Sequence, residues 1–184
     1  MGRNVVIAVT GASGSIYAHT LFEQLYNIRE QLENVALIFS DNAKSIWKHE
    51  MGKSFENKYG FGVYETNDFS APFASGSSYY DTMLVVPCSM GMLGRIAAGI
   101  SNDLITRSAD VILKEDRKLV LMLRDTPFNL IHIENMRKIL LSGGKIFPAI
   151  PSFYNHPESL DELVENLVLR LLDNVGFDVA IKRW

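Results

Sequence analysis

The sequence contains little cysteine, little histidine and no excess of positive charge, and each shortage excludes a class of protein. One cysteine, Cys88, cannot form an internal disulfide, and the four histidines (His19, His49, His132 and His156) share no ligand spacing with it or with one another. We therefore expect neither a disulfide scaffold nor a metal site, and a reducing cytoplasm fits best. The formal net charge of −3 leaves no positive excess for binding a nucleic-acid backbone.

Long apolar runs are also lacking. The longest, such as residues 5–9 and 83–86, fall far below the roughly 18 residues of a membrane span. The first of them ends in a glycine turn and is too short for a signal peptide, so no membrane association is expected. With 184 residues, of which 47% are hydrophobic and 21% charged, the chain suits a single globular domain over residues 1–184.

Apolar, β-branched segments alternate with helical patterns along the chain. The pattern predicts strands over residues 4–10, 35–39, 82–86, 119–123 and 145–150 and helices over 16–32, from Asp41 or Asn42, over 93–98, 102–114 and 130–141. A last helix starts at Ser159, with a capping box predicted between Ser159 and Glu162. This alternation is typical of a doubly wound, Rossmann-like α/β fold, a parallel sheet with helices on both faces.

In such a fold the loops that follow the strands meet at one edge of the sheet, where ligands bind. The first loop, residues 10–15 (TGASGS), joins a strand to a helix, so its free N–H groups and the helix dipole attract a phosphate. Gly11 and Gly14 allow close approach, and Ser13 and Ser15 add hydroxyl donors. The alternative is a tight turn with a serine N-cap.

Three other loops carry candidate side chains. Asp41 comes one residue later than the acid that usually binds a ribose in dinucleotide-binding domains, which weakens a nicotinamide reading. Cys88 has no neighbouring base, so we interpret it as a buried structural thiol. Arg124 and Asp125 follow an apolar strand directly and form either an anion clamp with an acid beside it or a structural ion pair.

Two cations on a predicted helix, Arg107 and Lys114, stand seven residues apart and so can share one face toward an anionic ligand. The alternative is that they pair with Asp103, Asp110 or Asp116 on a solvated surface.

Resemblance to a known family is carried by four segments: TGASGS, PCSMGMLGRIAAGISNDLITRSADVILKE, LRDTPFNLIHIENM and PSFYNHPESLDELV. Together they resemble the flavin prenyltransferases, the UbiX group of homo-oligomeric flavin-containing proteins, over nearly the whole chain. The resemblance implies metal-independent transfer of a dimethylallyl group from dimethylallyl phosphate to N5 and C6 of reduced FMN. It further implies a cytoplasmic homododecamer that passes prenylated FMN to a UbiD-type decarboxylase.

The resemblance also implies roles for particular residues. The implied FMN-binding residues are Gly11, Ala12, Ser13, Ser40, Ser89, Met90, Gly91, Met92, Arg107 and Arg124. The implied residues for the prenyl phosphate are Lys114, Tyr154, Arg170 and Trp184. Catalytic roles are implied for Ser13, Asp125 and Glu50, with Glu50 expected from a neighbouring subunit.

Two departures from the family pattern keep alternatives open. The family commonly has threonine at Met92 and glutamate at Asp125, so a non-catalytic flavin-binding protein is one alternative. A flavoprotein decarboxylase acting on a peptidyl cysteine is another, although His19 and His49 lack the setting of its histidine. A nicotinamide dehydrogenase is a distant third. Leu169, on the polar side of its predicted helix, and the pair Tyr79-Tyr80 suggest subunit contacts.

Overall fold

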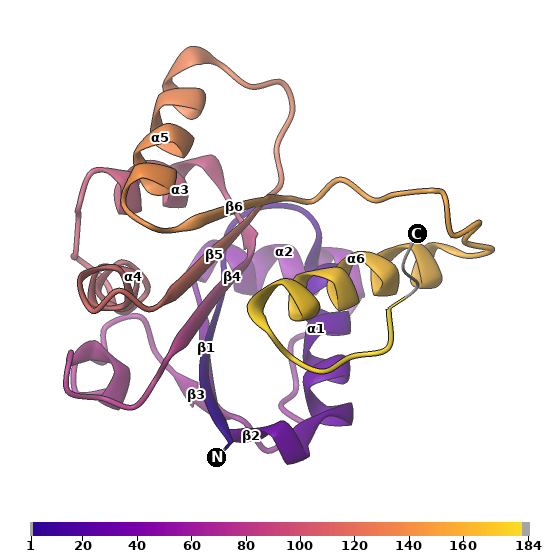
Figure 1. The fold of residues 1–184 in the computed structure, drawn as a ribbon, viewed down its shortest axis with the longest axis horizontal. Helices are drawn as coiled ribbons and strands as arrows, with labels where there is room; N and C mark the ends of the chain where they lie inside the picture. Colours follow the sequence, from indigo (N-terminus) through magenta and orange to yellow (C-terminus); the bar gives the residue numbers. More distant parts are fainter. Residues whose placement is uncertain (1, 182–184) are drawn as a thin grey trace.

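A six-stranded parallel sheet forms the centre of the computed structural model, which describes residues 2–181 (Figure 1). Its strands are β1 (Arg3–Val9), β2 (Leu32–Phe39), β3 (Gly62–Tyr64), β4 (Thr82–Cys88), β5 (Lys118–Leu123) and β6 (Lys145–Pro148). Their order across the sheet is β3-β2-β1-β4-β5-β6, and every neighbouring pair is parallel. This order confirms the doubly wound α/β fold, with its switch point between β1 and β4.

Six α-helices cover the two faces of the sheet (Figure 1): α1 (Ser15–Asn27), α2 (Asp41–Met51), α3 (Met90–Ala97), α4 (Leu104–Lys114), α5 (Leu130–Leu141) and α6 (Leu160–Val175). Helices α1, α2 and α6 share one core cluster, and α3, α4 and α5 share the other. Within β1, Val5 and Ile7 belong to the first cluster, and Val6 and Ala8 to the second. Burial on both faces explains why the strands read as continuous apolar runs.

Several boundaries differ from the sequence prediction. Strand β3 was not predicted, because Gly62 and Val63 are exposed and the edge strand is only three residues long. Strand β6 ends at Pro148, two residues before the predicted end. Helices α3 and α4 begin at Met90 and Leu104 instead of residues 93 and 102, since Ser89 and Asp103 cap them.

The cap of α6 and the pair Tyr79-Tyr80 also differ in part from expectation. Ser159 Oγ accepts from Glu162 N–H at 3.1 Å, as predicted, whereas Glu162 Oε2 accepts from the N–H of Glu158 at 2.9 Å. Tyr79 is 89% exposed, but Tyr80 is buried and packs edge-on against Phe73. Only the first of these tyrosines is therefore free for a subunit contact.

The two strands at the switch point are tied together by one buried hydroxyl. Thr10 Oγ1 donates to Pro87 O at 2.8 Å and accepts from Ser89 N–H at 2.9 Å. Thr10 thus fixes the loop after β1 against the loop after β4.

Among residues 2–181, no helix is long and apolar enough to span a membrane.

Candidate functional site

A cleft of about 480 Å³ opens where the loops after β1, β2, β3 and β4 meet, and we call it the switch-point cleft. Its volume lies within the range of small-molecule sites. It is mostly polar, being lined by Thr10, Gly11, Ser40, Asp41, Asn42, Thr66, Ser89, Gly91, Met92, Arg95 and Asp103. The sequence prediction that residues of separate loops share one sheet edge is confirmed.

Two helices start at this cleft behind serine caps. Ser40 Oγ accepts from Ala43 N–H, and Ser89 Oγ accepts from Met92 N–H, each at 3.2 Å. The first N–H groups of each helix have no intrahelical acceptor and carry the positive end of the helix dipole. A Cβ built on Gly91 would meet no heavy atom within 4 Å, so the space beside the first turn of α3 is open. The arrangement suits an anionic group.

The glycine turn before α1 already holds an anion, and that anion is Glu50. Its carboxylate accepts from Gly14 N–H at 3.0 and 3.1 Å and from Ser15 N–H at 2.7 Å. Gly14 is the N-cap of α1, at φ 114°, a conformation that favours glycine, so the expected serine cap is absent from this position. The phosphate expected at this turn therefore competes with a carboxylate of the same chain.

Two features of Glu50 follow from this position. It reaches the turn from the last turn of α2 in its own chain, whereas the family resemblance placed it on a neighbouring subunit. Partial burial alone would raise the pKa of Glu50, but hydrogen bonds from Ser13, Ser15 and Gly14 outweigh that effect and lower it. Glu50 is therefore ionised at neutral pH.

Arg124, just beyond β5, carries a donor that no described residue satisfies. Its Nε is buried without a hydrogen-bond partner, while its backbone N–H donates to Cys88 O at 3.3 Å. Asp125 is exposed and accepts from Thr126 N–H at 2.9 Å, and no ion pair joins it to Arg124 in the described part of the chain. The structural-ion-pair interpretation is therefore wrong. A buried donor without a partner costs free energy, which points to a ligand.

Tyr17 in the first turn of α1 lies beside this arginine. A Cβ built on Gly14 would lie 2.7 Å from Tyr17 Cδ2 and 4.0 Å from Arg124 Cγ. Burial raises the pKa of Tyr17, and the positive charge of Arg124 partly offsets that rise. The Arg124 side chain thus extends toward the start of α1.

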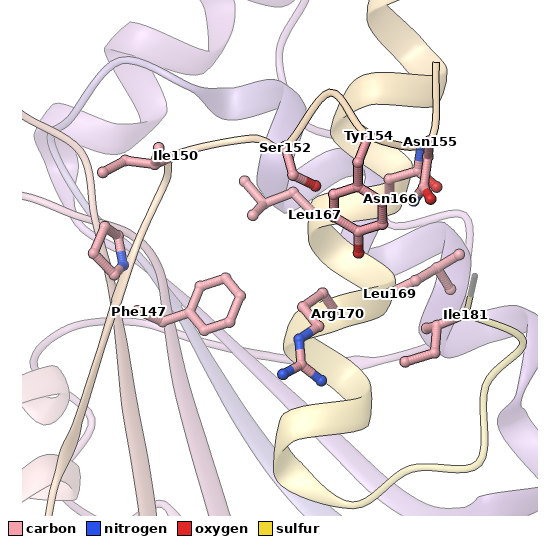
Figure 2. Close-up of a pocket in the computed structure, with 11 residues that line it drawn as sticks. Phe147, Ile150, Ser152, Tyr154, Asn155, Asn166, Leu167, Leu169, Arg170 and Ile181 are labelled. Atoms are coloured by element: carbon pink, nitrogen blue, oxygen red, sulfur yellow. The ribbon is translucent and has the colours of Figure 1, made fainter. Parts of the chain in front are cut away.

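A second cleft, also of about 480 Å³, lies between the segment after β6 and helix α6, and we call it the α6 cleft (Figure 2). Figure 2 shows Tyr154 and Arg170 on the same side of α6, with Phe147 across the cleft from them. Arg170 is half exposed and pairs with Asp173 at 2.7 Å. Asn166 also lines the cleft, and its Nδ2 is buried without a partner among the described residues. Apolar walls and polar groups suit an apolar molecule with an anionic head.

The structure does not bring Arg107 and Lys114 together at a ligand. Arg107 donates from Nε to Ala74 O at 3.1 Å and pairs at 3.4 Å with Asp110, one of the aspartates expected as its partner. Lys114 pairs with Glu115 at 2.7 Å instead of one of the expected aspartates. It ends α4, about 15 Å along the helix from Leu104, at the opposite edge of the sheet. Trp184 lies outside the described residues.

Other expectations have clear outcomes. Cys88 is fully buried, and burial raises the pKa of its thiol, which confirms a structural role. Arg95 lines the switch-point cleft and was not predicted as a site residue, and Asp103 was expected only as a partner of Arg107 or Lys114. Asp103 pairs with Arg95 at 2.5 Å instead. Arg95 follows Gly91 by one helical turn, a spacing that could have indicated it.

Comparisons with known proteins agree with this geometry. A family model described as Flavoprotein matches residues 1–170. The chain is 44% identical over 183 residues to the flavin prenyltransferase UbiX of Methanocaldococcus jannaschii, covering 98% of this chain and 97% of that protein. The chain belongs to the flavin prenyltransferase family.

Solved structures related to this family share the whole fold. The structure of AnUbiX (PadA1) in complex with FMN and dimethylallyl pyrophosphate superposes with a TM-score of 0.91 at 37% identity, covering 100% of this chain and 98% of that one. The dodecameric FMN-dependent UbiX-like decarboxylase of Escherichia coli O157:H7 gives 0.90 at 35% identity, with 98% of each chain covered. The family resemblance drawn from the sequence is confirmed.

Proposed function

We propose that this flavin prenyltransferase family member joins the dimethylallyl group of dimethylallyl phosphate to reduced FMN. The observation that carries the proposal is the presence of two clefts of equal volume on one edge of the sheet. One is polar and receives two helix N-termini, and the other combines apolar walls with a cation. Arg124 follows β5, which lies between β4 and β6 in the sheet, and its buried Nε has no partner among the described residues.

The switch-point cleft fits FMN. The first turn of α3 and the hydroxyls of Ser40 and Ser89 suit its phosphate, and the open space beside Gly91 leaves room for it. Arg124 does not line this cleft, and we assign it to the flavin because its buried Nε has no partner among the described residues. When bound, reduced FMN supplies the N5 and C6 atoms that accept the dimethylallyl group.

The α6 cleft holds the prenyl phosphate. Breaking the allylic C–O bond leaves negative charge on the phosphate, which the Arg170 guanidinium and the Tyr154 hydroxyl stabilise. Positive charge develops on the allyl carbons, and the face of Phe147 can lie against it. Leu167 and Ile150 also line this cleft and offer apolar contacts to the allyl group.

Three residues of the chain are proposed to handle protons. Glu50 is ionised and hydrogen-bonded to the Ser13 hydroxyl, so it can accept a proton through that oxygen. Asp125 is exposed beside Arg124 and can give or take a proton at its carboxylate. These roles for Ser13, Glu50 and Asp125 rest on their positions around the start of α1 and the end of β5.

Assembly into a homo-oligomer, in which the dodecamer is the form we propose, is supported by the surface of α5. Leu130, Ile131 and Leu141 are each at least 70% exposed on this helix, and an exposed apolar face of this kind marks an interaction site. Assembly also offers a role to Lys114, which can reach a prenyl phosphate only in another subunit. The product would pass to a UbiD-type decarboxylase in a reducing cytoplasm, where the single Cys88 stays a thiol.

The test is anaerobic incubation of the protein with reduced FMN and dimethylallyl phosphate or diphosphate, followed by mass analysis of the released flavin. We expect a flavin heavier by one dimethylallyl group with the monophosphate. The variant Arg124→Met should lose this product, whereas Arg29→Met, an exposed arginine at the far end of α1, should retain it. Flavin that is bound but returned unchanged with both donors would indicate a non-catalytic flavin-binding protein. A protein that binds no FMN would refute the proposal.

A further inference from the structure

Arg95 is the cation that the described residues place in the wall of the switch-point cleft. Its Nη1 donates to Asp103 Oδ2 at 2.5 Å and to Asn102 Oδ1 at 3.3 Å, and its Nη2 lies 3.6 Å from Met92 Sδ. The side chain is about one-third exposed. The guanidinium therefore lies over the residue where the family commonly carries a threonine hydroxyl.

Asp103 fixes the position of this guanidinium. It is the N-cap of α4, where its Oδ1 accepts from Thr106 N–H at 2.8 Å while Oδ2 receives Arg95. Arg95 itself lies one turn after Gly91, on the same face of α3. Gly91 and Arg95 both line the cleft, and no heavy atom lies within 4 Å of a Cβ built on Gly91, so the cleft has room for an anion that both residues face.

Among the helix starts beside the switch-point cleft, that of α3 carries no carboxylate. Glu50 holds the amides before α1, Asp41 stands in the first turn of α2, and Asp103 caps α4. The first turn of α3 has no acidic residue, and its cap is the neutral Ser89. Of these helix starts, that of α3 attracts a phosphate dianion most strongly, because its helix dipole is not opposed by a nearby carboxylate of its own first turn or cap.

We propose that Arg95 binds the phosphate of FMN at the start of α3 and replaces the contact that a threonine at position 92 would make. The inference rests on the proposed function and deepens it. Arginine suits the role because its planar donors engage a phosphate while the remaining N–H groups stay with Asp103. A role limited to clamping α3 against α4 is the contrary interpretation.

The experiment compares FMN with riboflavin, which lacks the phosphate, in fluorescence titrations of the parent and of Arg95→Met. Methionine keeps the apolar stem beside Met92 and removes the charge. We expect the affinity for FMN to fall about tenfold, the size of one charge-assisted hydrogen bond at a partly exposed site, with riboflavin affinity unchanged within about twofold. The FMN preference of the parent should also shrink with added salt.

Further variants separate this role from a structural one. Arg95→Lys should keep part of the preference for FMN, and Met92→Thr in the Arg95→Met background should restore part of the lost FMN affinity without changing riboflavin binding. Arg29→Met, far from the cleft at the other end of α1, serves as the matched control and should bind both flavins like the parent. Riboflavin binding itself reports that each variant is folded.

Two results would overturn the inference. Equal losses for FMN and riboflavin in Arg95→Met would show that the arginine only holds α3 against α4. A parent that binds FMN no better than riboflavin would place the phosphate outside the reach of Arg95. A parent that binds neither flavin would refute the proposed function itself, which distinguishes that failure from the first two.

Discussion

Replacing Glu50 tests whether a carboxylate of the chain's own α2 holds the glycine turn before α1. Glu50→Ala removes both oxygens that accept from the N–H groups of Gly14 and Ser15. Glu50→Gln keeps one neutral acceptor and removes the charge. Glu56→Ala, an exposed glutamate six residues later, serves as the control.

The expected magnitude follows from the hydrogen bonds and the exposure of Glu50. Loss of a side-chain cap costs about 1 kcal/mol, and an exposed anion at a helix N-terminus contributes about 0.3–1 kcal/mol. Because Glu50 is an exposed residue, we expect a loss near the lower end, about 1 kcal/mol for Glu50→Ala and about half of that for Glu50→Gln. In a chain of this length, 1 kcal/mol corresponds to a melting temperature about 2–4 °C lower.

Thermal melts across pH check the sign of the effect. The folded-state pKa of Glu50 is lowered, so its charge stabilises the fold at pH values above its ordinary pKa of about 4.3. That stabilisation is lost as the pH falls through the lowered pKa of the folded state. The gap in melting temperature between the parent and Glu50→Gln should therefore be constant from pH 7 to about 5 and close at lower pH.

The reasoning fails if Glu50→Ala melts with the parent and the Glu56→Ala control at pH 7, or if the gap to Glu50→Gln persists in acid. The same variants separate stability from chemistry. Glu50→Gln should bind FMN but form prenylated flavin slower by a factor on the order of 10²–10⁴, the usual contribution of a general acid or base. At temperatures below the melting temperature, a small loss of stability cannot lower the rate of prenylated-flavin formation by such a factor.

Three other predictions address the remaining groups. Asp125→Asn should keep FMN binding and slow single-turnover formation of prenylated flavin by about 10²–10⁴-fold, whereas Asp125→Glu should be tolerated. If Asp125→Asn formed product as fast as the parent, Asp125 would have only the structural role of accepting from Thr126 N–H. Arg170→Met should raise the KM for dimethylallyl phosphate by at least about tenfold with FMN affinity unchanged, while Asp173→Asn, which releases Arg170 from its ion pair, should not raise it. Ile131→Asp with Leu141→Asp should reduce the particle mass in light scattering, and an unchanged mass would place the subunit interface elsewhere.

The central sheet was predictable because its strands are buried on both faces. Short, continuous apolar runs such as residues 5–9 and 119–123 are typical of strands in a parallel sheet that helices cover on both faces. Strand β3 gave no such signal, since Gly62 and Val63 lie exposed at the sheet edge, where they pair with β2. The extent of α3 was underestimated because its cap, Ser89, and its first turn lie between Pro87 and Gly91, two residues that favour the prediction of a loop.

The candidate site was predictable in its location more than in its contacts. Parallel strands with right-handed crossovers place all the loops at one edge, so Ser40, Ser89 and Arg124 could be grouped from the sequence. The pair Arg95–Asp103 could not, because the chain reverses at Gly99, at φ 67°, and brings residues eight apart into contact across two helices. No regular spacing describes such a contact.

The glycine turn shows why a loop motif alone does not identify a phosphate site. Free N–H groups at a helix start attract any nearby anion, and here a carboxylate 35 residues beyond Ser15 takes that place. Sequence position alone does not indicate that α2 ends beside the start of α1. The complementary signal lies in the residues around each helix start: Asp41 and Asp103 supply negative charge at α2 and α4, and residues 89–92 supply none. Accounting for carboxylates at the helix starts around the switch-point cleft therefore points to α3, where counting glycines points to α1.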